Sequence, residues 1–267
     1  MEVAGSVKLF IVREIGCDKN EFVKFWSARY NDYTTVCDCL YREIKRNVAA
    51  KKNLVETINR MGAWKVPNCL SASKKVDGKR REGDFEIEGC NCTYRFTGRW
   101  KEGPPVAHYV WTNLHERFND HENAVKSESI EDIYALVDEL ADKKYNRWSK
   151  GKGEKRMMKV RFGLIYATTY LHFLDDRFPI LDLFVVRALD FLDDSKESTR
   201  PYLKSNRIGT RKKYFGDFVQ MFENFRKGLD ASTREVDRAL WAFGHYISNA
   251  KKVTSAPCCQ KQGFSAG

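Results

Sequence analysis

Asp182 lies at the start of the apolar segment L-D-L-F-V-V-R, which follows the acidic turn D-D-R-F-P at residues 175–179. A carboxylate at the N-terminus of a helix meets unpaired N–H groups and the positive end of the helix dipole, which fix its position. Such a group can simply cap the helix. It can also stabilise positive charge that develops on a sugar when a glycosidic bond breaks, and orient the attacking water. The position of Asp182 is compatible with both roles.

Residues 141–162, ADKKYNRWSKGKGEKRMMKVRF, are strongly basic and precede an apolar helix expected over 156–174. Glycines let a backbone approach a phosphate closely, and a helix N-terminus offers N–H groups to an anion. The segment therefore predicts nucleic-acid binding, although a solvated loop can have the same composition. The residues expected to bind nucleic acid are Lys150, Gly151, Lys152, Gly153, Lys155, Arg156, Lys159, Arg161, Arg187, Arg211 and Lys212.

The order of these features resembles that of the helix-hairpin-helix DNA glycosylase superfamily. In that family a glycine-containing hairpin precedes a buried helix, and a loop then leads to V-D-T-H-V-x-R, whose aspartate is catalytic. The resemblance covers about residues 150 to 190 and places Asp182 on that aspartate. Val185 and Arg187 match the valine and the arginine. Leu183 and Phe184 replace the threonine and the histidine, and the hairpin K-G-K-G-E-K lacks the family's apolar form.

The resemblance implies a mostly α protein with a glycosylase-like helical core and a small β-hairpin insert. It also implies an enzyme that flips a modified or damaged base out of double-stranded DNA and hydrolyses its N-glycosidic bond. Family members with lyase activity use a lysine about eighteen residues before the aspartate. Counting back from Asp182 gives Leu164, and the nearest bases are Lys159 and Arg161. We therefore expect a monofunctional enzyme that leaves an abasic site.

A flipped base requires an aromatic or apolar pocket. The candidate pocket residues are Trp111, Tyr166, Tyr170 and Trp241, although aromatic side chains also pack in cores. An insert over 66–108 could widen the pocket for a bulky modification, such as those of bacteriophage DNA.

The charge balance favours a polyanionic partner, because 47 lysines and arginines stand against 36 acidic residues. Two other functions stay open: a non-catalytic nucleic-acid-binding protein of the same fold, and a metal-dependent nuclease. We expect no cofactor and no metal, since the eight cysteines and five histidines lack typical ligand spacing. A zinc site formed by Cys69, Cys90 and Cys92 is the one metal alternative.

The sequence contains neither an apolar run of about twenty residues nor a secretory signal pattern. We therefore expect a protein away from membranes, in the cytoplasm, or in the nucleus of a eukaryote. We also expect a monomer.

The elements that must position these residues are mostly helices. Capping patterns at Asp18, Ser129 and Ser232 mark helix starts, and Gly228 marks the end of a helix over 211–227. The turn-rich sequence at residues 66–108 predicts β structure. The expected division is a helical part over 1–65, a basic β-like insert over 66–108, a helical domain over 109–250 that carries the hairpin and Asp182, and a flexible tail over 251–267.

Overall fold

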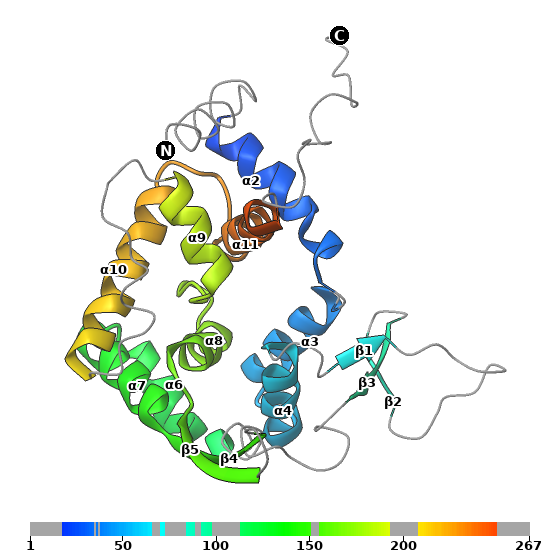
Figure 1. Cartoon of the computed structure of the whole chain (residues 1–267), viewed down its shortest axis with the longest axis vertical. Helices are drawn as coiled ribbons and strands as arrows, with labels where there is room; N and C mark the ends of the chain where they lie inside the picture. Colours follow the sequence, from blue (N-terminus) through cyan, green and yellow to red (C-terminus); the bar gives the residue numbers. More distant parts are fainter. Residues whose placement is uncertain are drawn as a thin grey trace, which may run out of the picture. The chain divides into compact units, whose positions relative to one another are not determined.

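The protein is mostly helical in the computed structural model, with two small antiparallel sheets (Figure 1). The predicted fold class is confirmed at this level, a mostly α chain with a small β insert. The described residues are 18–34, 36, 38–65, 70–72, 84–88, 92–97, 113–150, 155–192 and 208–249. The chain forms two compact units: unit 1 comprises 1–33, 182–204 and 217–267, and unit 2 comprises 34–181 and 205–216.

Unit 1 is built around helix α11 (Thr233–Asn249), which packs against α2 (Lys19–Ala28) and α9 (Leu183–Leu192). The Phe243 ring of α11 packs edge-to-face against the rings of Phe22 and Trp26 in α2, with ring centroids 5.2 Å apart in both pairs. Aromatic pairs of this geometry contribute about 0.5–1.5 kcal/mol beyond their buried area. Aromatic side chains of the two helices therefore form part of their contact.

The helix starts in unit 1 follow the predicted capping residues. Ser232 and Glu235 form a reciprocal capping box: the Ser232 N–H donates to Glu235 Oε2 at 2.8 Å, and the Glu235 N–H donates to Ser232 Oγ at 3.2 Å. Asp18 Oδ1 accepts a hydrogen bond from the Glu21 N–H at 2.8 Å. These bonds satisfy N–H groups that a helix leaves unpaired in its first turn.

Unit 2 is built around helix α8 (Leu164–Leu174), which is apolar on all sides, as the sequence predicts. Seven of its eleven residues are buried. It packs against α3 (Asp38–Ala49), α4 (Leu54–Lys65), α6 (Phe118–Lys126) and α7 (Ile130–Asp142). A helix without a polar face must be covered on every side, so α8 determines where its four neighbours pack.

A three-stranded antiparallel sheet in unit 2 confirms β structure within the predicted insert. The strands are β1 (Leu70–Ala72), β2 (Asp84–Glu86) and β3 (Thr93–Phe96), in the order β1-β3-β2. The remaining described elements are the 3-10 turns η1 (Tyr30–Asp32) and η3 (Leu114–Arg117), and helix α10 (Ile208–Arg226).

Residues 144–161 differ from the expectation, because a two-stranded ribbon stands where the sequence suggested a loop and the start of a helix. Strands β4 (Lys144–Lys150) and β5 (Lys155–Arg161) pair antiparallel, and the helix expected from residue 156 begins at Leu164. Gly163 precedes that helix with a φ of 85°, a conformation that L-residues in helices do not adopt. This backbone turn fixes the helix start after the strand.

The helices bear on the expectation that the protein lies away from membranes. Within the described ranges, no helix combines the length and the apolar composition that a bilayer crossing requires.

Gly244 of α11 makes the closest approach to α9 in unit 1. A Cβ atom at this position would overlap the Phe184 carbonyl oxygen and lie 2.6 Å from its carbonyl carbon. Backbone cannot swing aside as a side chain can, so the two helices are this close only because residue 244 is glycine.

We predict that Gly244→Ala lowers the free energy of unfolding by up to about 2 kcal/mol. Overpacking costs about 1–3 kcal/mol and outweighs the gain of roughly 1 kcal/mol in helix propensity. Urea titration measures the change. Gly216→Ala in α10 is the matched control, because its Cβ would meet the end of the Tyr134 side chain at 3.1 Å, which can move. Equal stability of Gly244→Ala and the natural chain would contradict this account.

Candidate active site

Asp182 caps helix α9. Its Oδ1 accepts a hydrogen bond from the Phe184 N–H at 2.9 Å, and its carbonyl oxygen accepts one from the Val186 N–H at 2.9 Å. The side chain is half-buried. A carboxylate offers about four lone-pair positions, so the cap bond is compatible with a further role. The capping role is confirmed, and the catalytic role stays a prediction.

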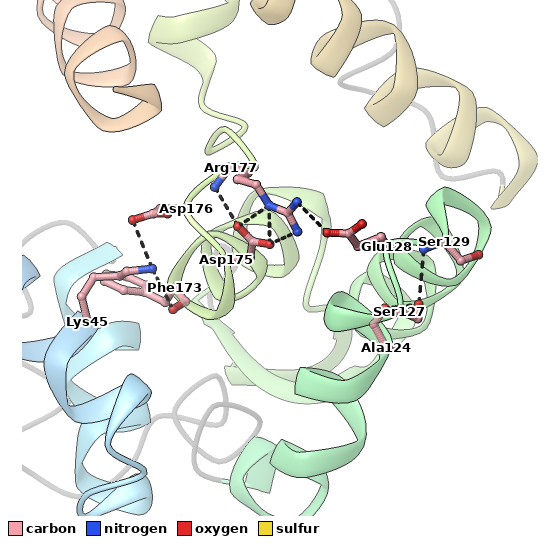
Figure 2. A network of polar contacts seen from close by, with 9 residues as sticks. All are labelled: Lys45, Ala124, Ser127, Glu128, Ser129, Phe173, Asp175, Asp176 and Arg177. Carbon is pink, nitrogen blue, oxygen red and sulfur yellow. Dashed lines mark hydrogen bonds and ion pairs between the residues drawn. The ribbon is translucent and has the colours of Figure 1, made fainter. Parts of the chain in front are cut away.

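The turn before Asp182 is held by ion pairs within unit 2 (Figure 2). Arg177 donates two hydrogen bonds to Asp175 Oδ2, from Nε at 2.9 Å and from Nη2 at 2.7 Å. Its Nη1 donates to Glu128 Oε1 at 3.2 Å. Burial tends to raise the pKa of Asp175, but the hydrogen bonds and charge of Arg177 outweigh it and lower that pKa. Lys45 pairs with Asp176 at 3.4 Å. These two acids therefore stabilise the turn.

Two further hydrogen bonds join this turn to α8. His172 Nδ1 donates to the Phe178 carbonyl at 2.6 Å, and Tyr41 Oη then donates to His172 Nε2 at 2.7 Å. The Leu181 N–H donates to Thr168 Oγ1 at 3.1 Å. The chain is thus fixed on α8 as far as residue 181.

Arg187, the arginine of the D-x-x-V-x-R pattern, lies at the contact of α9 with α11. Its Nη1 donates to Ser248 Oγ at 3.0 Å, and Ser248 Oγ donates to the Gly244 carbonyl at 2.6 Å. The guanidinium also lies 5.6 Å from the centroid of the Phe184 ring. The structure thus gives Arg187 a role in joining two helices, and its predicted binding of nucleic acid stays a prediction.

His245 is a site residue that the sequence did not indicate. It stacks on Phe184 with ring centroids 3.5 Å apart and lies 4.0 Å from the Trp241 ring. Burial lowers its pKa, the Asp182 carboxylate opposes this, and the Arg187 guanidinium adds to the lowering, so the imidazole is neutral at pH 7. Its Nε2 is buried and has no hydrogen-bond partner among the described residues. A neutral imidazole with an unused nitrogen therefore lies in the electrostatic field of Asp182.

The predicted pocket residues have different surroundings within their own units. Trp241 is half-buried beside His245, with its ring 6.0 Å from that of Phe184. Tyr170 is fully buried in unit 2, and its hydroxyl lies 3.1 Å from His121 Nδ1, so it offers no surface to a base. Tyr166 packs against Phe162 at 5.3 Å. Trp111 lies outside the described residues.

The predicted nucleic-acid-binding segment includes the β4–β5 ribbon. Its base is anchored in unit 2: the Phe162 N–H donates to the Lys143 carbonyl at 2.7 Å, and Arg161 Nε lies 3.1 Å from Asp142 Oδ1. Lys150, Lys155, Arg156 and Lys159 have strand positions, and Arg211 and Lys212 lie in α10. Gly151, Lys152 and Gly153 lie outside the described residues.

We searched the part of the chain that the structure describes for side chains that could bind a metal ion. No group of three or more His, Cys, Asp or Glu side chains there lies close enough together to hold a metal ion. Of the three cysteines of the zinc alternative, Cys69 and Cys90 fall outside the described residues, and Cys92 is half-buried just before strand β3.

Comparisons with known proteins found no match for this chain among protein-family models, curated proteins or solved structures. Its function must therefore be inferred from its residues and their geometry.

The buried His121–Tyr170 pair predicts a pH dependence of stability. Burial, with help from the charge of Lys143, lowers the pKa of His121 to about 4. Between pH 6.5 and 4 the unfolded chain therefore binds a proton that the folded chain does not, and stability falls as the pH falls. The loss from this residue reaches about 3 kcal/mol near pH 4.

His121→Phe should remove this dependence. The variant should be less stable than the natural chain at pH 7 to 8, because Tyr170 loses its partner, and the difference should shrink as the pH falls toward 4. Urea unfolding at several pH values measures the difference. A gap that stays constant from pH 8 to pH 4 would show that His121 is not kept neutral.

Proposed function

We propose that this protein is a DNA glycosylase that hydrolyses the N-glycosidic bond of a modified or damaged base flipped out of double-stranded DNA. The observation that carries this proposal is Asp182, a half-buried carboxylate fixed at the N-terminus of α9 within D-L-F-V-V-R. The helix dipole favours its charged form. A fixed negative charge is what a glycosidic cleavage needs, because the sugar becomes positive as the base departs.

In this reaction Asp182 stabilises the positive sugar and orients the water that attacks its anomeric carbon. The bond to the base breaks, and its electron pair leaves with the base nitrogen, which takes up a proton from solvent. The water oxygen bonds to the carbon, and the proton released by the water is accepted by a carboxylate or by solvent. The product is an abasic site. An amine is not supplied by the position expected for a lyase, since Leu164 is the first residue of α8 and Lys159 lies in strand β5.

The rings around Asp182 suit a base-binding role. Phe184, Trp241 and His245 form one aromatic group on α9 and α11. Aromatic faces stack on any base, and the His245 nitrogen adds one polar atom that can select a base edge. A hypermodified base of phage DNA would make the enzyme an antiviral defence, and a damaged base would make it a repair enzyme.

A second candidate, a non-catalytic DNA-binding protein, is favoured by the cap bond itself. The Asp182–Phe184 bond accounts for an aspartate at this position without any reaction. The two candidates differ in one respect: only the enzyme releases a base.

We predict that Asp182→Asn abolishes base release while DNA binding persists. Asparagine retains a cap oxygen but loses the charge, so excision should fall at least about a hundredfold. The assay incubates the protein with duplexes that carry single damaged or hypermodified bases, followed by hot alkali, which breaks the strand at abasic sites. Breaks that also arise without alkali would indicate a lyase and direct attention to Lys159.

Asp176→Asn is the matched control, since it removes one acid from the preceding turn and breaks one ion pair, with Lys45, in which the Asp176 carboxylate is mostly exposed. It should excise like the natural protein. Equal alkali-dependent cleavage by the natural protein and Asp182→Asn would eliminate the catalytic role of Asp182. Binding without cleavage across the panel would favour the second candidate.

His245→Phe tests the aromatic group. The variant retains a ring that can stack on Phe184 but removes the imidazole nitrogens. We expect stability and DNA binding to be kept and excision to fall by about ten- to a hundredfold, as for loss of a polar contact in a closed site. His245→Gln, which restores a polar atom without the ring, should recover part of the lost rate. Full activity of His245→Phe would restrict His245 to packing.

A further inference from the structure

We propose that the β4–β5 ribbon binds the phosphate backbone of duplex DNA with one of its two faces. This face, called here the lysine face, carries Lys144, Lys150, Lys155 and Lys159, with Arg161 at its base. The opposite face, called here the arginine face, carries Arg147 and Arg156. The choice of DNA as the polyanion rests on the proposed function, and the division into faces rests on the strand register.

The register assigns the residues to the faces. Lys144 pairs with Arg161, Asn146 with Lys159, and Lys150 with Lys155. Directly paired residues share a face of an antiparallel ladder, and alternate residues of a strand return to that face. Arg147 pairs with Met158, and Ser149 with Arg156, on the other face. Five of the seven basic residues of the two strands therefore fall on one side.

The ladder places like charges opposite one another. The Lys150–Lys155 and Lys144–Arg161 rungs each join two cations, and neither strand contains an acidic residue. Like charges directly opposite one another destabilise a ladder. At the base of the ribbon, Asp142 offsets one of these charges by pairing with Arg161 at 3.1 Å. Toward the tip, a polyanionic ligand would offset the others.

The base of the ribbon is continuous with the helical core of unit 2. The Phe162 N–H donates to the Lys143 carbonyl, and the Gly163 N–H donates to the Ala141 carbonyl at 3.0 Å. Phe162 is buried. These bonds extend the strand pairing into the end of α7 and the start of α8, so the lysine face has a fixed attachment to the core.

Duplex DNA is the polyanion that this shape fits best. A two-stranded ribbon can enter the major groove, and seven residues per strand extend over roughly 20 Å. The lysines lie six residues apart in β4 and four apart in β5, so they would meet phosphates at separate points along the groove. Such contacts are independent of base sequence, which suits an enzyme that must search DNA for a rare base.

Two double variants test the division into faces. Lys155→Gln with Lys159→Gln removes two charges from the lysine face, and Arg147→Gln with Arg156→Gln removes two from the arginine face. The affinity of each full-length variant for a short fluorescein-labelled duplex of unmodified DNA is measured by anisotropy over a range of salt concentrations. Circular dichroism and urea titration confirm that both variants are folded.

We expect the lysine-face variant to bind about tenfold or more weakly, and the slope of log affinity against log salt to fall by about 1.8, because two phosphate contacts are lost. The arginine-face variant should retain the natural slope. Equal losses in both variants would overturn the inference and leave a general charge effect. No loss in either, or a preference for single-stranded over duplex DNA, would overturn it as well.

These outcomes are separable from those of the proposed function. Base release by the natural protein together with unaltered DNA binding by the lysine-face variant would refute the ribbon interface and keep the glycosylase. A binding loss confined to the lysine face, with no base released from any duplex, would keep the interface and refute the glycosylase.

Discussion

The burial of helix α8 is the constraint on which unit 2 depends. A helix that is apolar on almost every side gains stability only if neighbours cover it, and α3, α4, α6 and α7 pack against α8, of which seven of eleven residues are buried. The same helix supplies the polar groups that fix the following turn. Thr168 and His172 are buried, and each uses its hydrogen-bonding capacity on the backbone after the helix. Hydrophobic burial and loop geometry are thus set by one element.

Local chemistry made part of this fold predictable. The Ser232–Glu235 capping box, the Ser129 cap and the burial of α8 depend on residues close together in sequence, and all are found. The helix expected from residue 156 is different, because K-R-M-M-K-V-R is rich in good helix formers and yet forms strand β5. Its conformation is decided by pairing with residues 144–150 and by the positive φ of Gly163. Neither is visible in a local pattern.

The candidate site shows the same division. The capping role of Asp182 could be predicted because an aspartate and the start of an apolar helix coincide in one short segment. His245 could not, because its relation to Phe184 arises only when α9 packs against α11. Tyr170 was expected in a pocket because tyrosine suits both pockets and cores, and the histidine that pairs with it lies on another helix. Side chains that act through tertiary contacts leave no periodic signal.

Under the proposed function, the contact at Gly244 allows substrate choice to change while the packing of the two helices is kept. It is the main chain of residue 184 that touches α11, and the Phe184 ring is not needed for that approach. The ring can therefore be exchanged for a larger, smaller or polar group while the spacing of the two helices is kept. Position 184 thus combines a fixed scaffold with a variable surface beside Asp182, which is the combination that natural selection or a mutant library requires to alter specificity without rebuilding the fold.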